Sequence, residues 1–171
     1  GGYADNISKD IKFYKLDCCD LTKVQDVMKG VDIVYHCAAT AHEGLSVFSP
    51  YEITKNNYLA SVSIFTAAIN NKVKRIVYCS SMARYGNSKT PFTEDMEPNP
   101  IDPYAISKVA STLDFIILSS ENSSLLFGTM APIWITPSTS GNKSQDHINS
   151  LKLCQTTFKI SLNILNTGGF L

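Results

Sequence analysis

Apolar residues follow two different periods in the first part of the chain, which predicts alternating strands and helices. In residues 11–17, apolar and aromatic side chains occupy alternate positions, as in a half-buried strand. Asp20 stands at the N-cap position of a following helix, and Gly30 comes after its last turn. The residues of this helix that share one apolar face are Leu21, Val24, Val27 and Met28.

Two further apolar runs predict buried strands, and two longer segments predict helices. Residues 31–39 and 75–81 are short, rich in β-branched residues and followed by polar positions, which is typical of buried parallel strands. Helical spacing of apolar residues predicts a helix over 50–71, and another begins at Pro103, a favoured first-turn position. This order predicts an α/β fold with right-handed crossovers, a parallel sheet and helices on both faces.

Polar residues follow the predicted strands at the edge where a ligand is expected. In open parallel sheets, ligands bind beyond the carboxyl ends of the strands. Asp20, Thr40, Ser80 and Ser81 follow those ends in this chain. We expect the hydroxyls of Ser80 and Ser81 to face this crevice rather than the core.

A tyrosine and a lysine one helical turn apart open the helix that begins at Pro103. Tyr51 and Tyr85 also precede a lysine by the interval that separates Tyr104 from Lys108, so the spacing alone is weak. The context distinguishes them, because Tyr85 lies in a predicted loop and no strand-end serine precedes Tyr51. Tyr104 and Lys108 follow such serines and are expected to fold back over the same edge.

This arrangement suggests proton transfer at a substrate hydroxyl. A phenol has a pKa near 10, and an ammonium about 4 Å away favours the phenolate by roughly 4 kcal/mol at an effective dielectric of about 20. Tyr104 would then exchange a proton with the hydroxyl while Ser81 donates a hydrogen bond to the same oxygen. Removing that proton is productive when a hydride leaves the adjoining carbon, which requires a nicotinamide cofactor.

Composition narrows the class of protein. With 171 residues, 44% of them hydrophobic, and fifteen acids against fifteen bases, the chain predicts one globular unit that binds neither nucleic acid nor a membrane. Five cysteines, an odd number without CxxC spacing, favour a reducing compartment, and we expect a cytoplasmic protein. Cys37 and Cys79 lie in apolar runs and are expected to be small buried hydrophobes. No pair of histidines has metal-ligand spacing, so no metal site is predicted.

Short motifs occur in a fixed order between residues 11 and 108. They are LDCCDLT, VDIVYHCAAT, NNYLAS, IVYCSSMARYG, PFTEDMEPNP and PYAISK. In this order and at these separations they resemble the extended short-chain dehydrogenase/reductases, specifically the NAD-dependent nucleotide-sugar epimerase/dehydratase group. The resemblance implies a Rossmann-like doubly wound parallel sheet, NAD as cofactor and a nucleotide sugar as substrate. It also implies a homodimer for the complete protein, formed through the helices that begin at residues 50 and 103.

The resemblance also assigns roles to individual residues. It implies that Ser81, Tyr104 and Lys108 are catalytic. The cofactor-binding residues that it implies are Asp20, Ala38, Ala39, Thr40, Asn57, Ser80, Tyr104 and Lys108. For Asp20 the alternative is a helix cap alone, and for Asn57 it is a polar residue on a helix surface.

The residues after Ser81 narrow the reaction within the group. Sugar 4,6-dehydratases have an acidic pair there, whereas this chain has Met82 and Ala83, so the pattern resembles a 4-epimerase. Arg84 departs from the family, which usually has an apolar residue at this position. Two alternatives stay open, a reductase or hydroxysteroid-type dehydrogenase of the same superfamily and a non-catalytic binding domain that keeps the fold.

Two departures from the family suggest an incomplete copy. The sequence contains no GxGxxG or GxxGxxG motif and begins at what resembles the loop before the family's third strand. After Lys108 the charge thins out, and the family's next landmark, an arginine-containing strand, is not found. The expected division is therefore a partial NAD-binding domain over 1–118 and an atypical segment over 119–171, with disorder or a coding-frame change as alternatives for the latter.

Overall fold

The computed structural model describes residues 6–93, 95–121 and 126–130 of the chain. Its sheet has three parallel strands in the order β1 (Ile33–His36), β2 (Arg75–Cys79) and β3 (Leu126–Met130). The helices α3 (Ala60–Asn70) and α4 (Pro103–Glu121) are the crossovers between consecutive strands. The α/β fold with a parallel sheet, predicted from the hydrophobic pattern, is confirmed.

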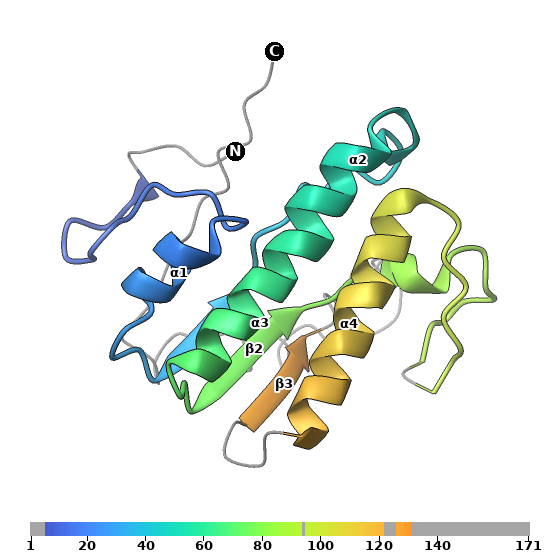
Figure 1. Cartoon of the computed structure of the whole chain (residues 1–171). Coiled ribbons are helices and arrows are strands. Elements are labelled where there is room, and N and C mark those ends of the chain that lie inside the picture. Colours follow the sequence, from blue (N-terminus) through green and yellow to red (C-terminus); the bar gives the residue numbers. More distant parts are fainter. Residues whose placement is uncertain (1–5, 94, 122–125, 131–171) are drawn as a thin grey trace, which may run out of the picture.

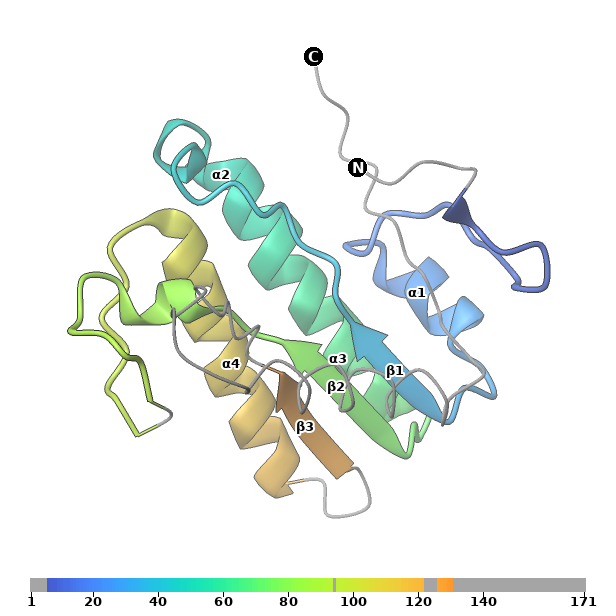
Figure 2. The same cartoon turned by 180° about the vertical axis from the view of Figure 1, so that it is seen from behind.

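The two crossover helices lie side by side on one face of the sheet (Figure 1). From behind, the strands stand in front of both helices (Figure 2). The strand order runs in one direction from β1 to β3, so right-handed crossovers place both helices on the same face. Strands on the other side of β1 would be needed to wind helices onto the second face. The described residues therefore show one of the two helical layers of a doubly wound sheet.

The first helix, α1 (Leu21–Val27), forms as its sequence predicts. The side chain of Asp20 accepts a hydrogen bond from the Lys23 backbone N–H at 3.1 Å, which caps the N-terminus. Val24 and Met28 are fully buried, and Gly30 ends the turn with φ at 77°, a conformation that favours glycine.

The strand predicted over residues 11–17 is wrong. These residues form no strand in the structure, although Leu16 is buried and Tyr14 packs against the core. A β-strand needs a neighbouring strand to accept and donate its backbone hydrogen bonds. None of the three described strands pairs with this segment. The alternating pattern thus correctly indicates that one side of the segment is buried, but it does not indicate whether a neighbouring strand is available for backbone hydrogen bonds.

The helix predicted over 50–71 contains an internal π-helical segment. It begins as α2 (Pro50–Ile53), continues as the π-helix η3 (Thr54–Leu59) and ends as α3. The wider turn brings Asn56 and Asn57 into buried positions. Since π-helical turns are rare and often occur at functional sites, this segment draws attention to the loop that Asn57 contacts.

An aromatic cluster between α3, α4 and the sheet forms the centre of the core. Phe65 lies 5.5 Å from Tyr78 and 5.2 Å from Phe115, measured between ring centroids. The ring of His36 stacks 5.4 Å from that of Tyr78 and is almost fully buried. Burial of these rings fixes both helices against β1 and β2.

His36 is held in a defined protonation state. Its Nε2 lies 2.9 Å from Ser61 Oγ, and the Ser61 hydroxyl donates its own proton to the Asn57 carbonyl oxygen. Nε2 must therefore carry the proton and donate to Ser61. Burial, followed by the positive charge of Lys108, lowers the pKa of His36 to about 3.

No helix in the described part of the chain is long and apolar enough to cross a bilayer.

The low pKa of His36 predicts a specific loss of stability in acid. The unfolded chain takes up a proton at His36 below about pH 6.5 and the folded chain does not until about pH 3, so the free energy of unfolding falls by up to about 1.4 kcal/mol per pH unit. His36→Gln keeps an N–H near Ser61 and removes this titration. In urea unfolding, the free energy of unfolding should fall less between about pH 7 and about pH 5 in this variant than in the parent. The exposed His42→Gln is the control, and an unchanged loss in His36→Gln would contradict the assignment.

Candidate active site

Three predicted catalytic residues meet beyond the carboxyl end of β2. Ser81 follows this strand, and Tyr104 and Lys108 lie on the first two turns of α4. All three are nearly buried in the described structure. Burial raises the pKa of Tyr104, while a hydrogen bond with the Ser81 side chain opposes this. The sequence prediction that a strand-end serine lies beside Tyr104 agrees with this geometry.

The start of α4 is fixed by its own cap. Asp102 Oδ1 accepts a hydrogen bond from the Ala105 backbone N–H at 2.8 Å, and Pro103 occupies the first helical turn. The hydroxyl of Ser46 also donates to Asp102, at 3.3 Å. These contacts fix where the helix begins, and therefore where Tyr104 is presented.

Lys108 is a buried cation that contacts the end of β2. Its Nζ donates to the Cys79 carbonyl oxygen at 2.9 Å and lies 5.1 Å from the centroid of the Tyr78 ring. The residue is 4% exposed, and burial lowers its pKa to about 8, although the nearby thiols of Cys79 and Cys37 oppose this. A buried ammonium costs stability, so its retention at this edge is typical of a functional residue.

The expectation that Lys108 lowers the pKa of Tyr104 is wrong for this arrangement. The pKa of Tyr104 is raised, first by burial and then by the negative charges of Glu43 and Asp102. The ammonium of Lys108 instead bonds the backbone of β2. The phenol therefore stays protonated until positive charge is added beside it.

Asn57 fixes the loop that follows β1. Its Oδ1 accepts from the Thr40 backbone N–H at 2.7 Å, and its Nδ2 donates to the Thr40 carbonyl at 3.3 Å and to Ser107 Oγ at 3.3 Å. At 2% exposed, Asn57 is not the surface residue of the alternative interpretation. It connects the loop of Ala38, Ala39 and Thr40 to α4.

Ser80 does not face the crevice, so that expectation is wrong. Its Oγ lies 2.9 Å from Thr112 Oγ1 of α4, and both hydroxyls are buried. The reason is the alternation of side chains along a strand, because Ser80 shares a face with Ile76 and Tyr78, which pack under the helices. The Ser80 hydroxyl thus connects the end of β2 to α4 and does not lie in the crevice with the Ser81 hydroxyl.

Asp20 lies at the surface, and its contacts are those of a helix cap. Its carboxylate caps α1 and pairs with the Lys23 ammonium at 2.9 Å, and the hydrogen bonds from Lys23 lower its pKa. The structure does not bring it to the cluster of Ser81, Tyr104 and Lys108. Its cofactor role therefore rests on the family resemblance.

A pair of thiols lies at the same edge and was not predicted from the sequence. Cys37 is exposed and Cys79 half-buried, so the expectation of two buried hydrophobes is wrong. Their sulfur atoms lie 3.4 Å apart. Aligning the two strand motifs, HCAA and YCSS, would have placed these cysteines opposite each other.

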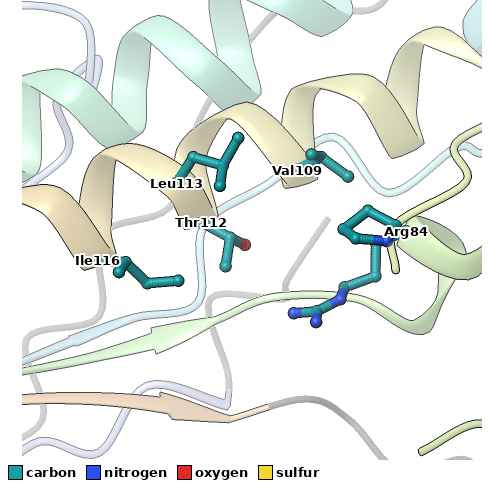
Figure 3. Close-up of a pocket in the computed structure, with 6 residues that line it drawn as sticks. Arg84, Val109, Thr112, Leu113 and Ile116 are labelled. Atoms are coloured by element: carbon teal, nitrogen blue, oxygen red, sulfur yellow. The ribbon is translucent and has the colours of Figure 1, made fainter. Parts of the chain in front are cut away.

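A small pocket lies beside this site, between the short 3-10 helix η4 (Met82–Tyr85) and α4. The side chain of Arg84 extends along it toward the sheet, opposite Val109, Thr112, Leu113 and Ile116 (Figure 3). The Arg84 guanidinium carbon stacks 4.7 Å from the centroid of the Tyr85 ring. This stacking accommodates the Arg84 cation at a position where the family that the sequence resembles usually has an apolar residue.

Comparison with known proteins identifies the family. Residues 2–157 match the model of the NAD dependent epimerase/dehydratase family. The chain belongs to this family. Its members are NAD-dependent enzymes, which confirms the cofactor and the Rossmann-like fold inferred from the ordered motifs.

Two curated relatives of the family show how far the sequence match extends. A UDP-glucose 4-epimerase of Lactobacillus helveticus is 34% identical over 111 residues, which cover 63% of this chain and 34% of the relative. The dTDP-D-glucose 4,6-dehydratase of Homo sapiens is 33% identical over 106 residues, covering 60% of this chain and 30% of the relative. The chain thus spans about a third of the length of these relatives.

Solved structures of family members share the fold. The chain superposes on UDP-glucose 4-epimerase from Thermotoga maritima with UDP-glucose at a TM-score of 0.70 and 26% identity, covering 75% of this chain and 43% of that one. The UDP-glucose 4-epimerase from Brucella ovis in complex with NAD gives a TM-score of 0.66 and 26% identity, covering 70% and 38%. Strand β3 lies inside the segment 119–171 that the sequence sets apart, while residues 131–171 lie outside the described residues.

Burial of Lys108 predicts that removing its charge stabilises the fold. Below about pH 8 the folded chain holds a buried ammonium, which costs roughly 3 kcal/mol from the lowered pKa. Loss of the hydrogen bond to Cys79 offsets about 1 kcal/mol, so Lys108→Met should raise the free energy of unfolding by about 2 kcal/mol at neutral pH.

The pH dependence provides the control. From about pH 8 to about pH 10.5 the unfolded chain holds the Lys108 proton and the folded chain does not, so the parent gains stability with rising pH. The difference in the free energy of unfolding between Lys108→Met and the parent, measured by urea unfolding, should therefore decrease across this pH range. The exposed Lys89→Met should show no gap at any pH, and a less stable Lys108→Met at neutral pH would refute the prediction.

Proposed function

We propose that this chain is part of a nucleotide-sugar 4-epimerase. In this reaction a sugar hydroxyl is oxidised to a ketone, the sugar turns, and the hydride returns to the other face of the carbon. The observation that carries the proposal is the meeting of Ser81, Tyr104 and Lys108 beyond β2, within an NAD-dependent family. The relatives named UDP-glucose 4-epimerase support the choice of reaction.

The carboxyl edge of the sheet fits NAD in part. NAD supplies the acceptor for a hydride and, when oxidised, a positively charged ring. The ammonium of Lys108 has three donors, and the described hydrogen bond to Cys79 uses one, so Lys108 can also bind ribose hydroxyls. The small side chains of Ala38 and Ala39 leave room beside the loop that Asn57 holds.

Tyr104 and Ser81 would act on the sugar oxygen. In the direction that forms the ketone, the Tyr104 phenolate takes the hydroxyl proton, and in the reverse direction the phenol returns it. The Ser81 hydroxyl, which is hydrogen-bonded to Tyr104 in the described structure, would turn its single proton toward the same sugar oxygen. Both groups lie on the rigid ends of β2 and α4, which limits the distances over which the proton must move.

The residues after Ser81 favour epimerisation over elimination of water. Elimination needs an acid to protonate the leaving hydroxyl. Met82 and Ala83 occupy the start of η4, and Ala83 is buried in contact with the cluster of Ile53 and Tyr104. Neither side chain can supply a proton.

Exposed apolar residues on the helices are consistent with the homodimer proposed for the complete protein. Ile106, Leu113 and Ile117 are more than half exposed on α4, and Leu59 is half exposed on η3. Elements η3 and α4 pack against each other, so these side chains flank a common helical surface. Burial of such a surface in a second copy would remove apolar area from water.

Binding of NAD to this chain is the first test. Isothermal calorimetry should detect binding, and Lys108→Met should raise the dissociation constant about tenfold or more, because one or two charge-assisted hydrogen bonds are lost. Asn57→Ala should weaken binding through the freed loop, and Lys89→Met should bind like the parent. Absence of binding at millimolar NAD, or equal binding in Lys108→Met, would contradict the cofactor site.

Product analysis separates the reactions open to this family. This chain, which lacks the family's glycine-rich motif, is expected to be compromised in turnover, so the test uses the complete protein. With UDP-glucose and a trace of NAD, the complete protein should form the C4 epimer without accumulating NADH. Tyr104→Phe should lower turnover by about a thousandfold, the range of a lost general acid–base. Tyr51→Phe is the matched control, since Tyr51 also precedes a lysine by one turn but is 75% exposed. Loss of water, net NADH formation or no product would each overturn the 4-epimerase proposal.

A further inference from the structure

Two thiols face each other at the carboxyl ends of β1 and β2. The last aligned pair of these parallel strands is His36 opposite Tyr78, so Cys37 and Cys79 form the next pair. Their sulfur atoms are 3.4 Å apart and hydrogen-bonded, and both cysteines are free.

We propose that Cys37 and Cys79 are a reversible thiol–disulfide pair, oxidised by peroxide to an intramolecular disulfide across β1 and β2. Neighbouring strands lie about 4.8 Å apart, within the range of about 4.4 to 6.8 Å between Cα atoms that a disulfide requires. The sulfur atoms need to approach from 3.4 Å to about 2.05 Å, which side-chain rotation can supply. The backbone therefore already has the spacing of the oxidised product.

Cys37 is the thiol that reacts first. It is the exposed member of the pair, so a small oxidant reaches it from solvent. The hydrogen bond from Cys79 and the charge of Lys108 lower the pKa of Cys37 to about 6, although burial opposes this. The pKa of Cys79 is raised by the same hydrogen bond and by burial. Thiolates are the nucleophiles in thiol chemistry, so the pair divides into an attacking Cys37 and a resolving Cys79.

The oxidation balances with peroxide as the oxidant. The Cys37 thiolate attacks one peroxide oxygen and the O–O bond breaks. Hydroxide is the leaving group, and Cys37 becomes a sulfenic acid. The Cys79 sulfur then attacks the Cys37 sulfur, the S–OH bond breaks, and the hydroxide takes the Cys79 proton as water. Two electrons pass from the two sulfur atoms to one peroxide, and an added dithiol reverses the change.

Two other cysteines in the described part of the chain have the opposite properties. Cys18 is fully buried, and burial raises its pKa to about 12. The thiol of Cys19 donates to the Lys55 carbonyl oxygen at 3.3 Å, and burial followed by the charge of Asp17 raises its pKa to about 11. Cys18 and Cys19 are neighbours in sequence, and both have a raised pKa, whereas the pKa of Cys37 is lowered.

The pair lies where a modification would affect the proposed cofactor edge. Cys37 directly precedes Ala38, and the Cys79 carbonyl holds the Lys108 ammonium. In a reducing compartment such a disulfide is transient, as expected of a redox-sensing pair. The disulfide itself is detected chemically and without NAD, so its failure is distinguishable from failure of the proposed function.

Peptide mapping of the oxidised chain tests the proposal. The native chain is treated with hydrogen peroxide, free thiols are blocked with iodoacetamide, and the digest is analysed by mass spectrometry without reductant. We expect a cross-linked peptide that joins residues 37 and 79, with Cys18 and Cys19 still alkylated. Dithiothreitol should remove the cross-link.

Single variants provide the controls. Cys37→Ser and Cys79→Ser should each abolish the cross-link, and Cys79→Ser should leave Cys37 as a sulfenic or sulfinic acid. Cys19→Ser should form the cross-link as the parent does. A cross-link from Cys37 to any other cysteine, sulfinic acid at Cys37 with Cys79 still free in the parent, or equal oxidation of Cys18 and Cys19 would each overturn the proposal.

Discussion

The parallel register of β1 on β2, in which His36 lies opposite Tyr78, determines most of what this structure can do. It stacks the two rings under α3 and α4, where Phe65 and Phe115 complete the aromatic core. One residue further on, the same register sets Cys37 beside Cys79. Parallel strands end at the same edge, so the loops after β1 and β2 open together toward α4.

A chain of buried polar groups connects that register to the edge. His36 donates to Ser61, Ser61 donates to the backbone of Asn57, and the Asn57 side chain holds the loop at Thr40 and reaches Ser107 on α4. Buried polar groups cost free energy unless they are bonded, and here each bond joins a different pair of elements. The π-helical segment η3 contributes to this arrangement, since it places Asn57 in a buried position.

The sequence predicted the elements of this fold better than the direction of its polar side chains. The two buried strands, the three helical segments and the cap at Asp20 follow from period and capping, which are local properties. Residues 11–17 show the limit, because alternation reports a buried side but not whether a backbone partner exists. Ser80 and Cys37 show a second limit. A shift of one residue reverses the face of a strand, so an apolar run ending in small polar residues does not reveal which of them point into the crevice.

The protonation of Tyr104 was the least predictable property, since it depends on distances that no spacing rule provides. Lys108 follows Tyr104 by one helical turn, but its ammonium donates to the Cys79 carbonyl oxygen, and Glu43 and Asp102 oppose the phenolate. Burial therefore raises the pKa of Tyr104 and lowers that of Lys108 to about 8, so at neutral pH the phenol is neutral and the ammonium keeps its charge. The carboxylates of Glu43 and Asp102 disfavour the phenolate by Coulomb repulsion. A positive charge placed at the edge would favour the phenolate by Coulomb attraction. In the proposed reaction, proton removal by Tyr104 would thus be coupled to occupancy of the edge by a hydride acceptor.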